Sequence, residues 1–174
     1  MPLHLLLGGA RSGKSALAVR LAQSWAGPVV FIATGEARDA DMAERIEQHQ
    51  RARPAGWTTV EEARELVSAL QDVPDDAFLV VDCLSLWVAN VMEAGWEEDR
   101  IEEAARTAAG LLSKRPAGSV VVSNEVGLGV VPATELGRTY RDVLGRVNMV
   151  FAEAAEPTQL IVAGRALDLG SPPA

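Results

Sequence analysis

The stretch LLLGGARSGKSALAV, residues 5–19, decides the fold of this chain. A short apolar run stops at two glycines, and Gly8 to Ser15 then match the pattern G-x-x-x-x-G-K-[ST] before a helical pattern begins. Glycines allow the backbone to curl so that successive N–H groups face inward and form an anion-binding nest. The free N–H groups and the dipole of the following helix favour phosphate at the same place. The stretch therefore predicts a strand, a phosphate-binding loop and a helix.

The loop is expected to hold the phosphates of ATP or GTP. We expect the Lys14 ammonium to reach the β- and γ-phosphate oxygens and to act in catalysis, and the Ser15 hydroxyl to coordinate Mg²⁺. A chance lysine in an ordinary turn is the alternative, but the motif lies between a strand-like and a helix-like run, as its function requires. The loop residues expected to contact nucleotide are Gly8, Gly9, Ala10, Arg11, Ser12, Gly13, Lys14 and Ser15.

Two acidic residues are candidates for completing the Mg²⁺ site. Asp82 ends the apolar run FLVVD, where an acid on a second strand would face the phosphate loop. Its alternative role is a helix N-cap. Glu125 follows SVVVSN, and its alternative role is that of a solvated loop carboxylate.

Short apolar runs alternate with helical patterns along the chain. Runs of this kind, without polar alternation, indicate strands that are buried on both faces of a mostly parallel sheet. We therefore predict one three-layer α/β domain over residues 1–174, with a frayed tail at 169–174, and expect ligands at the carboxyl ends of the strands. The predicted strands are 3–7, 29–33, 78–82, 119–123 and 159–163, and the predicted helices are 14–26, 39–52, 60–71, 85–94, 98–113 and 133–155.

Composition limits the functions to consider. The formal net charge of −8 argues against broad nucleic-acid binding, which needs a basic surface. The single cysteine excludes an internal disulfide and a cysteine-only metal cage. The N-terminus lacks the basic start of a signal peptide, and no apolar stretch is long enough to span a membrane. We expect a soluble, cytoplasmic protein.

His49 is the second of two histidines, and its surroundings are unusual. Met42, Ile46 and His49 follow the spacing of one helix face, so a histidine that packs against the core is one interpretation. Nearby arginines suit a phosphate-lined pocket instead, and their charge would favour the neutral, nucleophilic imidazole. Such an imidazole beside a bound triphosphate could attack phosphorus.

Several stretches together resemble one family over about residues 3–165. The stretches are GGARSGKS (8–15), FIATGEARDADMAERIEQHQRARPAGW (31–57), VVDCLSLWVAN (80–90), SNEVGLGVVP (123–132) and RTYRDVLGRVN (138–148). Their order and spacing are similar to those of the bifunctional adenosylcobinamide kinase / adenosylcobinamide-phosphate guanylyltransferase of cobalamin biosynthesis. The resemblance implies a parallel-rich P-loop sheet of the RecA-like kind and assembly as a homotrimer.

The resemblance also implies two reactions and a set of site residues. Such enzymes phosphorylate adenosylcobinamide with ATP or GTP, and then transfer GMP from GTP to adenosylcobinamide phosphate, which releases pyrophosphate. The family's nucleophile falls on His49, which would carry GMP covalently. Beyond the phosphate loop, the implied nucleotide contacts are Ala33, Thr34, Gly35, Gln50, Arg51, Ala52, Arg53, Glu61 and Asp82.

Other functions remain open at this point. A plain P-loop kinase of small molecules would use Lys14 and leave His49 in a packing role, without a covalent GMP intermediate. A nucleotide-dependent protein switch would need a guanine-selective motif such as N-K-x-D, which the sequence lacks. A corrinoid-binding module without catalysis would not need the lysine and serine of the phosphate loop.

Overall fold

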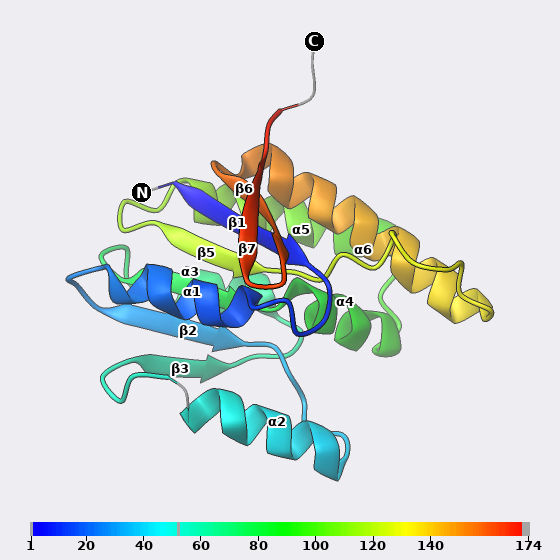
Figure 1. The fold of residues 1–174 in the computed structure, drawn as a ribbon, viewed down its shortest axis with the longest axis horizontal. Helices are drawn as coiled ribbons and strands as arrows, with labels where there is room; N and C mark the ends of the chain where they lie inside the picture. Colours follow the sequence, from blue (N-terminus) through cyan, green and yellow to red (C-terminus); the bar gives the residue numbers. More distant parts are fainter. Residues whose placement is uncertain (1, 52, 172–174) are drawn as a thin grey trace.

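A mostly parallel sheet organises the fold (Figure 1). The computed structural model describes residues 2–51 and 53–171, except for the side chains of Met42, Arg45 and His49. Within this part of the chain, seven strands follow the order β3-β2-β4-β5-β1-β6-β7, and only the β6–β7 pair is antiparallel. The strands are β1 (Leu3–Gly8), β2 (Val29–Ala33), β3 (Thr58–Glu61), β4 (Phe78–Asp82), β5 (Ser119–Val122), β6 (Thr158–Val162) and β7 (Arg165–Leu169).

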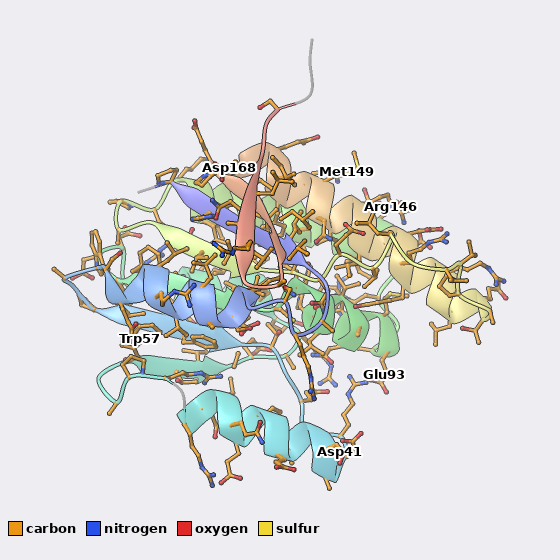
Figure 2. The ribbon with its side chains drawn as sticks, in the orientation of Figure 1. Asp41, Trp57, Glu93, Arg146, Met149 and Asp168 are labelled. Carbon is orange, nitrogen blue, oxygen red and sulfur yellow. The ribbon has the colours of Figure 1, made fainter. Side chains whose placement is uncertain are left out.

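Helices cover both faces of the sheet, which confirms the predicted three-layer α/β architecture. In Figure 1, α1 lies on one face, α3 to α6 lie on the other, and α2 lies beyond β3 at the sheet edge. Figure 2 labels Arg146 on α6, whose Nε donates to Glu102 of α5 at 2.5 Å and so joins two helices of the same layer. The helices are α1 (Lys14–Gln23), α2 (Ala40–Arg51), α3 (Leu66–Gln71), α4 (Leu84–Glu93), α5 (Glu98–Ser113) and α6 (Glu135–Ala154).

The core lies on both sides of the sheet because the central strands carry apolar side chains on both faces. Every residue of β2 and β5 is buried. One cluster packs between the sheet and α3 to α6 and includes Trp87 and Phe151, both fully buried. The other packs against α1 through Ala18 and Ala22, whose small side chains allow the helix to lie close to the strands. Burial of this apolar area supplies the main driving force for folding.

Strand register brings the carboxyl ends of four strands into one row. Ala33 of β2 pairs with Glu61 of β3 on one side and with Asp82 of β4 on the other. Asp82 pairs in turn with Val122 of β5. Parallel strands that end together leave the segments following them at a common edge, which is where ligands bind in such folds.

Several elements differ from the prediction. The predicted helix 60–71 begins with the last two residues of a strand, β3, and only its second half is helical, in the shorter helix α3. The strand was missed because its sequence, TTVE, is polar and largely exposed at the sheet edge. β7 was missed because it is a short edge strand, RALDL, in which every residue is exposed. Leu169 pairs with Thr158, so the predicted frayed tail at 169–174 starts too early; residues 172–174 lie outside the described part of the chain.

None of the helices in the part of the chain that the structure describes combines the length and the apolar composition that a membrane span needs.

Candidate active site

The phosphate loop connects β1 to α1 and depends on glycine at two positions. Gly8 has φ +152°, and a Cβ there would lie 2.3 Å from the carbonyl oxygen of Ile161. Gly13, at the N-cap of α1, has φ +102°, which other residues rarely adopt. The β6–β7 turn packs on the loop, where the Gly164 N–H donates to the Ser12 carbonyl at 2.8 Å. The loop conformation is therefore fixed by its backbone and by its neighbouring strand.

Lys14 lies inside this loop and is only 6% exposed. Its ammonium donates to the carbonyls of Gly8 and Gly9, at 2.8 and 2.6 Å, and more weakly to the Ser12 hydroxyl at 3.4 Å. An ammonium group has three hydrogens, so these oxygens satisfy it in its buried position. Burial lowers the pKa of Lys14, and the neighbouring Cys83 and Asp82 partly oppose that shift. The hydrogen bonds to these oxygens hold the Lys14 side chain at the position that the motif requires.

A cleft of about 930 Å³ opens beside the loop. Its volume lies in the range of pockets that bury a small organic ligand. Gly8, Gly9, Thr34, Gln50 and Arg51 do not line it. Those residues predicted to bind nucleotide that do line it are Ala10, Arg11, Ser12, Gly13, Lys14, Ser15, Ala33, Gly35, Arg53, Glu61 and Asp82.

Asp82 and the turn after β4 are held against the end of β2. The Thr34 N–H donates to the Asp82 carbonyl at 3.1 Å. The Thr34 hydroxyl accepts from the Cys83 N–H at 2.8 Å and donates to the Cys83 carbonyl at 2.7 Å. Thr34 itself is fully buried, so it supports the cleft floor rather than facing a ligand. Cys83, not Asp82, occupies the N-cap of α4, so the alternative role of Asp82 as an N-cap is wrong.

The residues predicted to hold Mg²⁺ are only partly brought together. Ser15 and Asp82 line the same cleft and offer the oxygen donors that this cation prefers. Glu125 does not line it, because its carboxylate accepts from the Gly127 N–H at 2.6 Å while its own N–H donates to the Gly8 carbonyl at 3.1 Å. Among the described residues, no group of three His, Cys, Asp or Glu side chains could form a metal cage. A cation here would rely on water and phosphate oxygens for its remaining ligands, as Mg²⁺ commonly does.

Arg53 also lines the cleft. Its guanidinium lies 3.9 Å from the centre of the Phe31 ring and donates to the Thr59 hydroxyl at 3.3 Å. The Arg53 Nε is buried without a hydrogen-bond partner among the residues that the structure describes. Burial lowers the pKa of Arg53, and the carboxylates of Asp82 and Glu61 oppose the shift. A half-buried cation with a spare donor suits an anionic ligand.

Helix α2 borders the cleft through its second half. Ile46 and Gln48 line the cleft, and Gln50 donates to the Glu61 carboxylate at 2.6 Å. The backbone of His49 belongs to this helix, while its side chain lies outside the described part of the structure, as does Ala52. Arg51 pairs with Glu47 one turn earlier. Gln48, before His49, thus lines the cleft, and Gln50, after it, contacts Glu61, which also lines the cleft.

Sequence reasoning missed some residues around the cleft. Asn124 and Leu86 line it, although neither was given a role. Ser123 and Asn148 form a buried pair behind Asn124, with the Ser123 hydroxyl 2.6 Å from the Asn148 Oδ1 and the Asn148 amide donating to the Asn124 carbonyl at 3.1 Å. The position of Asn124 directly after a predicted strand was the available signal.

The fold and the phosphate loop together define the class of protein. A solved ATPase from the type III secretion system of pathogenic bacteria superposes with a TM-score of 0.56 at 8% identity, covering 91% of this chain and 50% of that one. A solved protein from Pyrococcus horikoshii OT3 superposes with a TM-score of 0.57 at 9% identity, covering 96% and 85%. With its α/β layers and its phosphate loop, the chain is a P-loop NTPase of the RecA-like kind, which binds ATP or GTP.

Sequence comparison gives the family. Residues 4–169 match the model of the family described as cobinamide kinase / cobinamide phosphate guanyltransferase, and the chain belongs to this family. It is therefore a bifunctional enzyme, a kinase and a guanylyltransferase with cobinamide substrates, which confirms the resemblance.

Relatives match over nearly their whole length. The bifunctional adenosylcobalamin biosynthesis protein CobP of Pseudomonas aeruginosa is 41% identical, with 97% of this chain and 98% of the relative covered. The corresponding CobU proteins are 39% identical in Salmonella typhimurium and 36% in Escherichia coli, each with 92% of this chain and 95% of the relative covered.

Replacing Lys14 by Met should abolish both activities while the fold persists. The substitution keeps the aliphatic stem but removes the charge that the loop is built to hold, so we expect kcat/KM to fall by about 10²-fold or more. Steady-state assays of both reactions provide the measurement. Lys114→Met, at the exposed end of α5, removes a surface lysine and should leave both rates unchanged. Retained activity in the Lys14 variant would contradict the assigned role.

Cys83 should resist thiol reagents. Burial is the main cause that raises the pKa of its thiol from 9.0 to about 11. The neutral thiol therefore persists at pH 8, and the reactive thiolate gains population only as the pH approaches 11. We expect reaction with a disulfide reagent at pH 8 to be at least about 100-fold slower in the native protein than after denaturation. Rapid native labelling, absent in Cys83→Ser, would show that the residue is accessible and ionised.

Proposed function

We propose that the single cleft beside the phosphate loop serves both reactions. In the first, adenosylcobinamide is phosphorylated by ATP or GTP with Mg²⁺; in the second, GMP passes from GTP to adenosylcobinamide phosphate by way of His49. The observation that carries the proposal is the shared lining of the cleft: Lys14, Asp82 and Gln48, the residue that precedes His49 on α2, all line it.

The kinase step needs positioning and charge neutralisation rather than a covalent intermediate. The substrate hydroxyl oxygen attacks the γ-phosphorus, its proton is lost, and the bond to the nucleoside diphosphate breaks. We assign Lys14 to the phosphate oxygens and Ser15 and Asp82 to the Mg²⁺ ion. Arg53 also lines the cleft and would neutralise charge on the nucleotide.

The guanylyl step uses two displacements at the α-phosphorus of GTP. A neutral imidazole nitrogen of His49 forms a P–N bond as pyrophosphate leaves. A phosphate oxygen of adenosylcobinamide phosphate then forms a P–O bond as the P–N bond breaks, which returns the histidine to its free form. A covalent carrier splits transfer between two large substrates into two smaller steps. Direct transfer of GMP from GTP to adenosylcobinamide phosphate, without a covalent intermediate, is the alternative, and it would leave GTP unable to modify the chain.

We further propose that the chain assembles as a homotrimer in the cytoplasm, where its nucleotide substrates are abundant. Large apolar side chains on the loop before α6 and on its first turn support assembly, since exposed apolar patches mark protein interfaces. Leu128, Val130, Val131 and Leu136 are 82, 95, 64 and 71% exposed. The number of three subunits rests on the family resemblance.

Incubation with Mg²⁺ and GTP labelled at the α-phosphorus should label the chain. We expect acid-labile, base-stable label, because a P–N bond to histidine hydrolyses in acid, and we expect His49→Ala to take none. His4→Gln is the matched control, since His4 is the other histidine and lies on β1 bonded to Gln159. Label that survives in His49→Ala, or its absence from active wild-type protein, would contradict the covalent step.

Light scattering after gel filtration should give three times the chain mass of 18.5 kDa. Replacing Val130 by Asp puts a charge on the apolar patch and should shift the mass toward that of one chain without changing the circular dichroism spectrum. A wild-type mass equal to one chain would refute the trimer, and an unchanged variant mass would place the interface elsewhere.

A further inference from the structure

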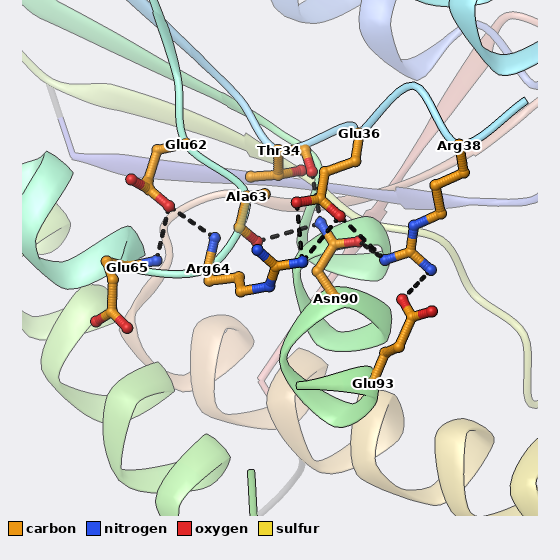
Figure 3. A network of polar contacts seen from close by, with 9 residues as sticks. All are labelled: Thr34, Glu36, Arg38, Glu62, Ala63, Arg64, Glu65, Asn90 and Glu93. Carbon is orange, nitrogen blue, oxygen red and sulfur yellow. Dashed lines mark hydrogen bonds and ion pairs between the residues drawn. The ribbon is translucent and has the colours of Figure 1, made fainter. Parts of the chain in front are cut away.

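We infer that Asn90 is a positioning residue for guanylyl transfer: from α4 it holds together the ends of β2 and β3 and the segment that leads into α2. This inference rests on the proposed role of His49, and it concerns a residue that touches neither the phosphate loop nor the cleft. Figure 3 shows the network around this side chain.

Both the NH₂ group and the carbonyl oxygen of the Asn90 side chain make hydrogen bonds. It is 2% exposed, and its Nδ2 donates to the Thr34 carbonyl at 2.7 Å and to the Ala63 carbonyl at 3.2 Å. Its Oδ1 accepts from the Arg38 guanidinium at 2.6 Å. An amide presents two donor hydrogens on one side and an acceptor on the other, and here the carbonyls and the cation match that arrangement. No other side chain of this size can make the same set of contacts.

The three partners belong to segments that build the active site. Thr34 follows β2 and binds the Asp82 carbonyl and both backbone polar groups of Cys83. Ala63 lies two residues after Glu61, which lines the cleft. Arg38 precedes α2, which starts at Ala40 and contains His49. Asn90 therefore sits where the supports of Asp82, of the cleft wall and of the histidine helix meet.

Arg38 and Arg64 continue this network to the protein surface through ion pairs. Arg38 pairs with Glu93 of α4 and lies 3.3 Å from Glu36, to which Arg64 also binds at 3.0 Å (Figure 3). Such exposed pairs contribute little energy each. These pairs nevertheless connect residues 36 and 38 to α4, whose core-facing residues are fully buried. The segment that leads into α2 is therefore held against a well-packed helix.

The two reactions depend on this anchor to different degrees. The hydrogen bonds of the Lys14 ammonium all fall on Gly8, Gly9 and Ser12, so the phosphate loop is organised without Asn90. Helix α2 is held near His49 by the hydrogen bond from Gln50 to Glu61 and by Ile46, which lies near Gly35, and it is held at its start by the segment that Arg38 ties to α4. Loss of the anchor should therefore displace the histidine more than the phosphate loop, and small displacements of a reacting group are costly.

The test uses Asn90→Asp and Arg38→Met in the full chain. Asn90→Asp keeps the size and the partner for Arg38 but directs a carboxylate oxygen at the Thr34 and Ala63 carbonyls. Arg38→Met removes the outer contact from a half-exposed residue and should fold normally. We expect the guanylyltransferase rate and the rate of chain labelling by GTP to fall by about 10- to 100-fold in Asn90→Asp and by a smaller factor in Arg38→Met. The kinase kcat/KM should stay within about threefold of wild type in Arg38→Met. In Asn90→Asp, which also disturbs Thr34 beside Asp82, it should fall by a smaller factor than the guanylyltransferase rate.

Arg115→Met is the matched control for lost stability. Arg115 is also buried and donates to carbonyls, those of Val73, Pro74 and Ala77, but these lie at the amino-terminal end of β4, away from the cleft. It should lower the melting temperature while the ratio of the two activities stays constant. The inference is overturned if Asn90→Asp and Arg38→Met leave guanylyl transfer intact, or if they reduce both reactions equally. Absence of label from wild-type protein instead refutes the role of His49, and the ratio of the two steady-state rates still decides the role of Asn90.

Discussion

The ammonium group of Lys14, buried among the carbonyl oxygens of its own loop, is the interaction on which the active site depends. A buried cation is costly unless its hydrogens are bonded, and here the backbone of Gly8 and Gly9 supplies the acceptors. That backbone can turn inward only because Gly8 has a φ that excludes a side chain and a neighbour, Ile161, that leaves no room for one. The same turn presents N–H groups to phosphate at the start of α1.

The sheet supplies the rest of the site through its register. Because β2, β3 and β4 end in one row, Ala33, Glu61 and Asp82 reach the cleft from adjacent strands. Helix α2 differs from the other helices, since it lies beyond the sheet edge rather than on a face of the sheet (Figure 1). This arrangement separates a rigid phosphate site from a peripheral helix that carries His49, which suits an enzyme that must treat the γ- and α-phosphorus of bound nucleotides differently.

Sequence predicted those parts of the molecule that have a strong local signal. The phosphate loop, the buried strands and the order of layers follow from glycine spacing and from apolar runs, and they are confirmed. The edge strands β3 and β7 were missed because their short sequences, TTVE and RALDL, are largely exposed and lack such runs. Glu125 was placed in the metal site because it follows a strand, yet its carboxylate folds back onto the Gly127 N–H. Asn90 carried no signal, because its importance comes from three segments that only the folded chain brings together.

The central claim is that one cleft, with one phosphate loop, serves both reactions. Its most direct test is the stoichiometry of nucleotide binding, measured by equilibrium dialysis with non-hydrolysable ATP and GTP analogues that carry different labels. The account predicts one nucleotide per chain in total, with each analogue displacing the other competitively, and loss of both in Lys14→Met. Simultaneous binding of one ATP analogue and one GTP analogue to the same chain would contradict it and would require a second nucleotide site.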